Sequence, residues 1–130
     1  MIIDRRECSV LSLVLTRKWY DLIASGRKRE EYRLATEYWQ KRLWNWHLAV
    51  TPKIAPVVEF RCGYARDARR MAFWVFGQGT PGGMMPYSFV AAGEPREFKH
   101  PEWGEPDNAH FVIKLGGHVV FSKGKEGGEE

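Results

Sequence analysis

The run from residue 26 to residue 33, Gly-Arg-Lys-Arg-Glu-Glu-Tyr-Arg, joins two kinds of sequence periodicity and therefore constrains the fold strongly. The preceding residues 17–25 carry apolar side chains at helical spacing, which predicts a short helix with one apolar face. Gly26 fits the left-handed residue that ends such a helix. Residues 29–34 then predict a short strand, so the chain passes from helix to strand within a few residues.

The expected strand over residues 29–34 alternates its side chains between two faces. One face would carry Arg29, Glu31 and Arg33, and the other Glu30 and Tyr32. Lys28 lies at the turn before the strand and can reach either side. A lysine, a carboxylate and an arginine this close together can bind a phosphate or carboxylate and tune one another's ionisation. A solvated charge run on an edge strand would have the same composition.

The remaining pattern indicates an α+β fold without internal repeats. Further strands are expected over residues 9–15, 57–64, 71–76, 111–115 and 118–121, with room for a short one at 87–92. Thr36 is a good N-cap for a second helix that runs to about His47. Turn-forming composition predicts a basic hairpin turn at residues 65–70, a long loop at 77–110 and a turn at Gly116-Gly117.

The length of 130 residues suits one domain, which we place at residues 1–122, with a disordered tail at residues 123–130. The two cysteines, Cys8 and Cys62, form no CxxC pair, which favours a reduced, cytoplasmic setting. The longest early apolar stretch, residues 10–15, is far too short to span a bilayer and does not resemble a signal peptide. We therefore expect no membrane partner.

Several catalytic and cofactor motifs can be set aside. Glycines 77, 79 and 82 spell GxGxxG, but Pro81, Gly83 and Pro86 forbid the helix that a dinucleotide site needs. The four histidines have no metal-ligand spacing with each other or with the cysteines, and neither GxSxG nor HExxH occurs. The sequence thus predicts no metal and no cofactor, and gives no support to a serine hydrolase or a zinc protease.

Positive charge is concentrated in the first part of the chain. Residues 1–93 hold 15 lysines and arginines against 8 acidic residues, whereas residues 94–130 hold 5 against 8. Aromatic residues, among them Trp19, Tyr20 and Tyr64, lie between the basic ones. Cations beside aromatic rings are the combination that binds single-stranded nucleic acid, although core packing would also use these rings.

Gly26, Lys28, Glu31 and Arg33 match all four positions of a GxKxxExR motif. With this motif, residues 9–121 resemble the ASCH domain (activating signal cointegrator homology). The Leu-Ser-Leu strand before the motif and the apolar strands at 57–64 and 111–116 agree with that family. The resemblance implies a PUA-like mixed β-barrel with two to three short helices, and a motif-lined cleft proposed to bind RNA or a nucleotide derivative.

One branch of the family consists of amidohydrolases acting on N4-acetylcytidine, in which the motif lysine is the proposed nucleophile. A threonine three residues later assists it, and other members have been described as ribonucleases. The resemblance makes Lys28 the candidate nucleophile, but Glu31 stands at the threonine position. This departure weighs against the amidohydrolase reading and leaves the binding cleft intact.

The chemistry of the three charged residues has two alternatives. If Glu31 pairs with Lys28, the lysine stays protonated and acts as a phosphate or carbonyl ligand. If Arg33 neutralises Glu31 instead, Lys28 is freer to react and Glu31 could act as a general base. Glu59 is a second candidate carboxylate, although the solvent face of a strand would also accommodate it. The residues alone do not choose between these arrangements.

Three functions follow in order of preference. The first is binding of RNA or a nucleotide derivative, for which the expected contact residues are Lys28, Arg33, Lys18, Arg61, Trp19 and Tyr64. The second is a small hydrolase, N4-acetylcytidine amidohydrolase-like or a ribonuclease, with Lys28, Glu31 and Arg33 as catalytic residues. The third is a non-catalytic interaction module that binds a protein partner through the tryptophan-rich helix over residues 38–46.

Overall fold

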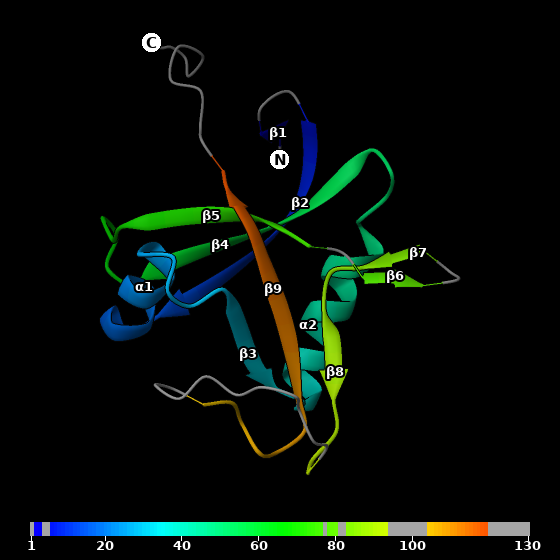
Figure 1. The fold of residues 1–130 in the computed structure, drawn as a ribbon. Coiled ribbons are helices and arrows are strands. Elements are labelled where there is room, and N and C mark those ends of the chain that lie inside the picture. Colours follow the sequence, from blue (N-terminus) through cyan, green and yellow to red (C-terminus); the bar gives the residue numbers. More distant parts are fainter. Residues whose placement is uncertain (1, 4–5, 77, 81–82, 94–103, 120–130) are drawn as a thin grey trace.

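The computed structural model describes residues 2–3, 6–76, 78–80, 83–93 and 104–119. Within these ranges the chain forms two helices and nine strands (Figure 1). The helices are α1 (Arg17–Ala24) and α2 (Glu37–Leu48). The strands are β1 (Ile2–Ile3), β2 (Arg6–Leu15), β3 (Glu30–Leu34), β4 (Ile54–Cys62), β5 (Arg70–Val75), β6 (Gln78–Thr80), β7 (Gly83–Met85), β8 (Ser88–Val90) and β9 (His110–His118).

Seven strands form one curled mixed sheet in the order β1-β2-β4-β5-β9-β3, with β8 also paired to β9. Strands β2 and β4 are parallel, and the other pairs are antiparallel. Strand β9 crosses the sheet: its first half pairs with β3 and β8 and its second half with β5 (Figure 1). The result is a half-barrel with two helices, which confirms the predicted α+β class.

The connection from α1 to β3 follows the prediction closely. Gly26 has a left-handed φ of 83°, and its N–H donates to the carbonyl of Ile23 at 3.0 Å. The N–H of Lys28 donates to the carbonyl of Leu22 at 3.1 Å, which ties the lysine to the last turn of α1. Strand β3 begins two residues later, so the GxKxxExR motif spans the hydrogen-bonded connection between helix α1 and the sheet.

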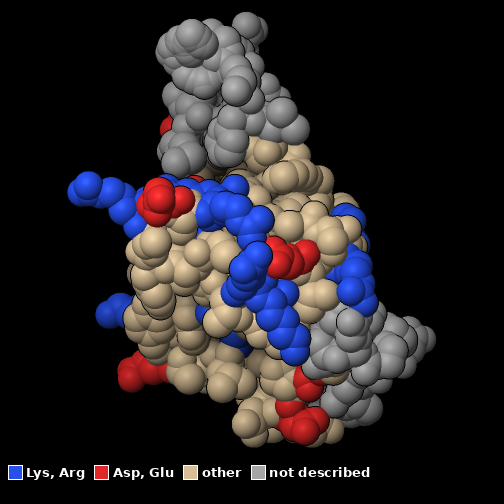
Figure 2. Space-filling model, turned by 90° about the vertical axis from the view of Figure 1, so that its left-hand side faces the viewer, with Lys and Arg blue, Asp and Glu red and all other residues tan. Residues whose placement is uncertain are grey.

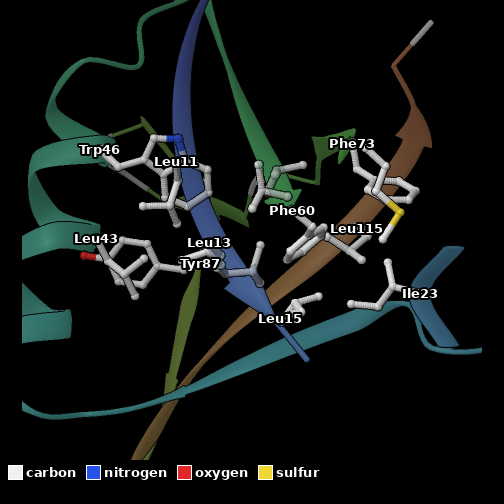
Figure 3. Close-up of a cluster of buried hydrophobic side chains, with 14 of the residues drawn as sticks. Leu11, Leu13, Leu15, Ile23, Leu43, Trp46, Phe60, Phe73, Tyr87 and Leu115 are labelled. Atoms are coloured by element: carbon white, nitrogen blue, oxygen red, sulfur yellow. The ribbon is translucent and has the colours of Figure 1, made fainter. Parts of the chain in front are cut away.

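The main core fills the inside of the curled sheet (Figure 3). Alternate residues of β2 point into it, and both helices add side chains to the same cluster. The labelled members are Leu11, Leu13, Leu15, Ile23, Leu43, Trp46, Phe60, Phe73, Tyr87 and Leu115. The Nε1–H of Trp46 donates to the carbonyl of Ser9 at 2.9 Å, and the Ser9 hydroxyl donates back to the Trp46 carbonyl at 3.1 Å. Helix α2 is thus fixed to β2 by packing and by polar contacts.

The turn predicted at Gly116-Gly117 is wrong, because β9 continues through both glycines to His118. A Cβ atom at Gly116 would lie 3.0 Å from the carbonyl oxygen of Trp74. Glycine is therefore needed there because β5 approaches closely, beside the irregularity in the β5–β9 register. The separate strand predicted at 118–121 is wrong at its start, since His118 ends β9, and residues 120–121 lie outside the described ranges.

Residues 77–110 hold more structure than the loop that their composition predicts. Strands β6 and β7 pair as a short antiparallel hairpin, and β8 lies within the short strand expected at 87–92. Residues 77, 81–82 and 94–103 lie outside the described ranges, as does the tail at 123–130 with the domain boundary before it. Strands β2 and β4 also start three residues earlier than predicted, at Arg6 and Ile54.

In the part of the chain that the structure describes, neither helix has the length and apolar character that crossing a membrane requires.

Candidate functional site

A cleft of about 500 Å³ opens where β2 passes into α1. Its volume lies in the range of about 300–1,000 Å³ that is usual for small-molecule sites. Three separate segments line it: Val14, Leu15, Thr16 and Trp19; Lys28, Glu31, Tyr32 and Arg33; and Gly104, Glu105 and Pro106. The cleft therefore brings together Lys28, Glu31, Arg33 and Trp19 from the residues that the sequence predicts.

The register of β3 explains how a carboxylate comes to be buried in this cleft. Glu31 pairs with Ile113 and Arg33 with Phe111, two residues of the main core. Directly paired residues of antiparallel strands point to the same face of a sheet. Glu31 therefore points to the inside of the half-barrel, where it is 6% exposed and needs a partner for its charge.

Glu31 forms two ion pairs, one with each carboxylate oxygen. The Lys28 Nζ lies 3.2 Å from Oε1, and the Arg33 Nη2 lies 2.8 Å from Oε2. The pairing of Glu31 with Lys28 and its pairing with Arg33, which the sequence analysis gave as alternatives, thus occur together. The predicted alternation of β3 is confirmed as well, since Glu31 contacts Arg33 while the Tyr32 hydroxyl donates to Glu30 at 2.9 Å.

Lys28 is the most deeply buried cation of the cleft, with 3% of its surface exposed. Its Nζ also donates to the carbonyl oxygen of Glu30. The rings of Tyr32 and Trp19 lie 4.7 and 5.6 Å from the same nitrogen, at cation–π distances. Two acceptors and two aromatic rings around one nitrogen form a setting suited to an ammonium group.

A second carboxylate on the wall of the cleft belongs to Glu105. Its Oε2 lies 2.7 Å from Nε2 of His110, and both side chains are almost fully buried. The His110 Nδ1 lies 2.8 Å from the carbonyl oxygen of Asn108, and because that oxygen only accepts, Nδ1 carries a hydrogen. The histidine thereby fastens the 104–106 segment beside Tyr32, whose ring meets it edge to face. The cleft is thus lined by Lys28, Glu31 and Arg33 and by a further acidic residue whose side chain is held by a histidine.

The other predicted contact residues lie outside the cleft. Lys18 is exposed next to it, with Nζ 4.8 Å from the Trp19 ring. Arg61 lies on β4 and donates from Nη2 to the carbonyl of Ala65 at 2.8 Å. Tyr64 is 85% exposed in the turn between β4 and β5.

Two further residues from the sequence analysis also lie elsewhere. Glu59, the second candidate carboxylate, accepts from the Ser12 hydroxyl at 3.2 Å outside the cleft. Tyr20 is a core residue, 4% exposed, and its burial raises the pKa of its hydroxyl. It therefore does not present its ring to a ligand.

Some lining residues escaped the prediction because their signal is tertiary. Glu105 lies within residues 77–110, for which the sequence predicts a loop. Nothing in the local pattern distinguishes it from the other acidic residues nearby. Beside the cleft, the ring of Trp39 on α2 lies 4.8 Å from the Arg33 guanidinium, a contact between two elements that no local pattern indicates. Tyr32 also lines the cleft, and its place inside the charged run is a local signal for such a role.

Basic side chains gather on the face that carries α1 and the turn between β4 and β5 (Figure 2). The exposed cations of these elements are Arg17, Lys18, Arg66, Arg69 and Arg70. Asp21 pairs with two of them, at 3.7 Å from Arg17 and 3.0 Å from Arg69. The hydrogen bond that Arg69 donates to Asp21 raises the pKa of Arg69, so part of this positive charge is already compensated.

A second groove lies between α2, β9 and the residue that precedes β8. It measures about 570 Å³ and is lined by Glu37, Gln40, Lys41, Trp44, Tyr87 and Phe111. Trp44 and Leu48 leave 48% and 60% of their surfaces exposed on α2. Burial raises the pKa of the Tyr87 hydroxyl at the base of the groove. Apolar surface is thus exposed on the helix for which a protein partner was considered.

Among the described residues, no three histidine, cysteine or acidic side chains gather closely enough to hold a metal ion. Comparisons with protein-family models, with curated proteins and with solved structures find no match for this chain.

Proposed function

We propose that this chain is an ASCH-type, PUA-like protein that binds RNA or a nucleotide derivative in the cleft around Lys28, Glu31 and Arg33. The observation that carries the proposal is the composition of the cleft: aromatic rings, hydrogen-bond donors and carboxylate acceptors surround a volume of about 500 Å³. The GxKxxExR pattern and the half-barrel agree with that family, and the cleft lies where its motif would line one.

The balance of charges suggests which part of a nucleotide enters the cleft. The positive charges of Lys28 and Arg33 are already directed at Glu31, and the side chain of Glu105 is held by His110. A phosphate placed here would meet cations that are already paired and would lie close to the Glu31 carboxylate. A nucleobase is neutral, offers donors and acceptors along its edge, and can stack on Trp19 or Tyr32. We therefore assign the base to the cleft and the phosphates to its rim.

Replacing Trp19 by leucine tests this assignment, because leucine keeps apolar packing and removes the ring. Stacking on one aromatic ring contributes about 1–3 kcal/mol per base, so affinity should fall roughly 5- to 150-fold. Isothermal titration calorimetry with ribonucleosides, ribonucleoside 5′-monophosphates and a single-stranded RNA decamer would measure it. Thermal unfolding of each variant checks that the fold is kept.

The matched control is Trp44→Leu, which removes an exposed ring from the other groove. Affinity should stay within about twofold of the wild type, since this ring does not border the cleft. If none of the three ligands binds, or if both substitutions weaken binding equally, the proposal is wrong.

A hydrolase remains the second candidate, favoured by the size of the cleft and by the burial of a lysine and a glutamate within it. Against it stand the contacts of Lys28. Its Nζ donates hydrogen bonds to a carbonyl and to a carboxylate, so the nitrogen is engaged with the protein and is not directed at a substrate carbon, as a nucleophile requires.

A further inference from the structure

The cleft continues onto α2 through a chain of stacked cations and rings. The guanidinium of Arg33, at the edge of the cleft, lies 4.8 Å from the ring of Trp39. The guanidinium of Arg42 lies 5.2 Å from the same ring and 5.9 Å from the ring of Tyr38. Its Nη1 also lies 3.4 Å from the Tyr38 hydroxyl. These residues make an unbroken surface from the cleft to the first turns of α2.

Arg42 is the uncompensated cation of this surface. Its Nη2 donates to the carbonyl oxygen of Ser12 at 3.1 Å, which holds the side chain in place. None of the carboxylates in the described ranges forms an ion pair with it, in contrast to Arg33, which pairs with Glu31. A guanidinium held by a neutral carbonyl keeps its full charge for an anion outside the protein.

Tyr38 supplies the ring at the outer end of the surface. It is 61% exposed, so one face is open to a stacking partner. Its edge meets the Trp39 ring at 5.0 Å, which limits the orientations of the tyrosine. A fixed cation beside an exposed ring is the pairing that binds a phosphate and its neighbouring base in single strands.

We infer that a single-stranded nucleic acid with one base in the cleft continues over the first turns of α2. Arg42 then contacts a backbone phosphate, and Tyr38 stacks on a neighbouring base. The inference rests on the proposed function for the cleft itself. The inference goes beyond that function because it gives the nucleic acid a path, toward α2 and away from the basic turn between β4 and β5.

The experiment compares a polymer with a single nucleotide. The probes are single-stranded RNA and DNA decamers of one sequence and ribonucleoside 5′-monophosphates. Tyr38→Ala should weaken decamer binding by at least about fivefold, and Arg42→Gln by about three- to tenfold at low salt. Binding of the monophosphates should change less than about twofold, because neither residue lines the cleft.

Two variants outside the proposed path serve as matched controls. Trp44→Leu removes an exposed ring from the other groove of α2, and Arg66→Gln removes an exposed cation from the turn between β4 and β5. Both should leave decamer affinity unchanged. Arg42→Lys should retain most of the affinity that Arg42→Gln loses, because it keeps the charge.

The outcomes separate this inference from the function of the cleft. If Trp19→Leu weakens decamer binding while the Tyr38 and Arg42 variants do not, the α2 surface is not part of the path and the cleft assignment stands. If the controls lose as much affinity as the Tyr38 and Arg42 variants, binding is spread over the basic surface and the inference is overturned. If neither decamer binds, both proposals fail.

Discussion

At the scale of single residues, the two ion pairs of Glu31 are better explained by a binding site than by a contribution to the stability of the fold. Burying a carboxylate with two cations gains little net stability, because desolvation of the charges offsets their attraction. A chain under selection for stability alone could place apolar residues at the mouth of the half-barrel. Groups that keep charges desolvated beside a cleft are characteristic of functional sites.

Lys28→Arg separates a binder from a lysine-dependent hydrolase. A guanidinium keeps the positive charge but does not act as an amine nucleophile. A binding cleft should therefore keep affinity within roughly tenfold and tolerate Lys28→Arg better than Lys28→Ala, which leaves Glu31 one cation short. Calorimetry with the same ligands, and an assay of N4-acetylcytidine deacetylation, measure the two activities.

We expect weak or no deacetylation by the wild type, since Glu31 replaces the assisting threonine and binds Lys28 directly. Robust turnover by the wild type that Lys28→Arg abolishes would reverse the order of the two candidate functions.

The candidate site could be predicted only where its residues lie close in sequence. Spacing within the charged run identified Lys28, Glu31 and Arg33, because strand alternation decides which of them share a face. Glu105 and its contact with His110 depend on how the 104–106 segment returns to β3. No local pattern encodes that return, so the second carboxylate of the cleft could not be anticipated.

At the scale of elements, glycine has two different structural roles, at Gly26 and at Gly116. The sequence predicts the first role but not the second. Gly26 ends a helix with a positive φ, which a helical pattern before it makes predictable. Gly116 lies inside a strand because the backbone of β5 leaves no space for a side chain. A pair of glycines after an apolar strand favours a turn on local grounds, and the close approach that explains them is tertiary.

Gly116→Ala and Gly117→Ala form a matched pair that tests this explanation. An alanine Cβ at position 116 would lie 3.0 Å from the Trp74 carbonyl oxygen, so strand β5 must shift. We expect a loss of about 1–3 kcal/mol in the free energy of unfolding, as for other overpacked sites. At position 117 the nearest atom would be 3.9 Å away, an ordinary contact, and the change should be within about 0.5 kcal/mol.

Urea denaturation followed by circular dichroism would measure both glycine variants. Equal stability of the two would show that close packing against β5 is not the reason for glycine at position 116.

At the scale of the whole molecule, charge is divided between the inside and the outside of the cleft. Inside, Lys28 and Arg33 are paired with Glu31, and Glu105 is paired with His110. Outside, Lys18 lies on α1 beside Trp19 and Arg42 lies on α2, and neither is paired with a carboxylate of the described residues. This division predicts different responses to salt for a base and for a polymer.

Binding of an uncharged ribonucleoside should be nearly independent of salt, because it releases no counterions. Binding of a single-stranded RNA decamer should weaken with salt, with a log-log slope of about −0.7 for each phosphate contact. Contacts by Lys18 and Arg42 would give a slope near about −1.4, and Lys18→Gln should halve it. Arg61→Ala should leave it unchanged, since that guanidinium lines neither the cleft nor the surface on α2.

Titrations at several salt concentrations would supply these slopes, with Arg66→Gln as the control for a general loss of positive charge. A nucleoside whose affinity falls steeply with salt would place charge recognition inside the cleft and contradict the assignment of the base. A decamer whose affinity is indifferent to salt would remove Lys18 and Arg42 from the binding surface. The two slopes therefore test the inside and the outside of the cleft independently, because the nucleoside carries no phosphate and the cations at the rim do not reach its base.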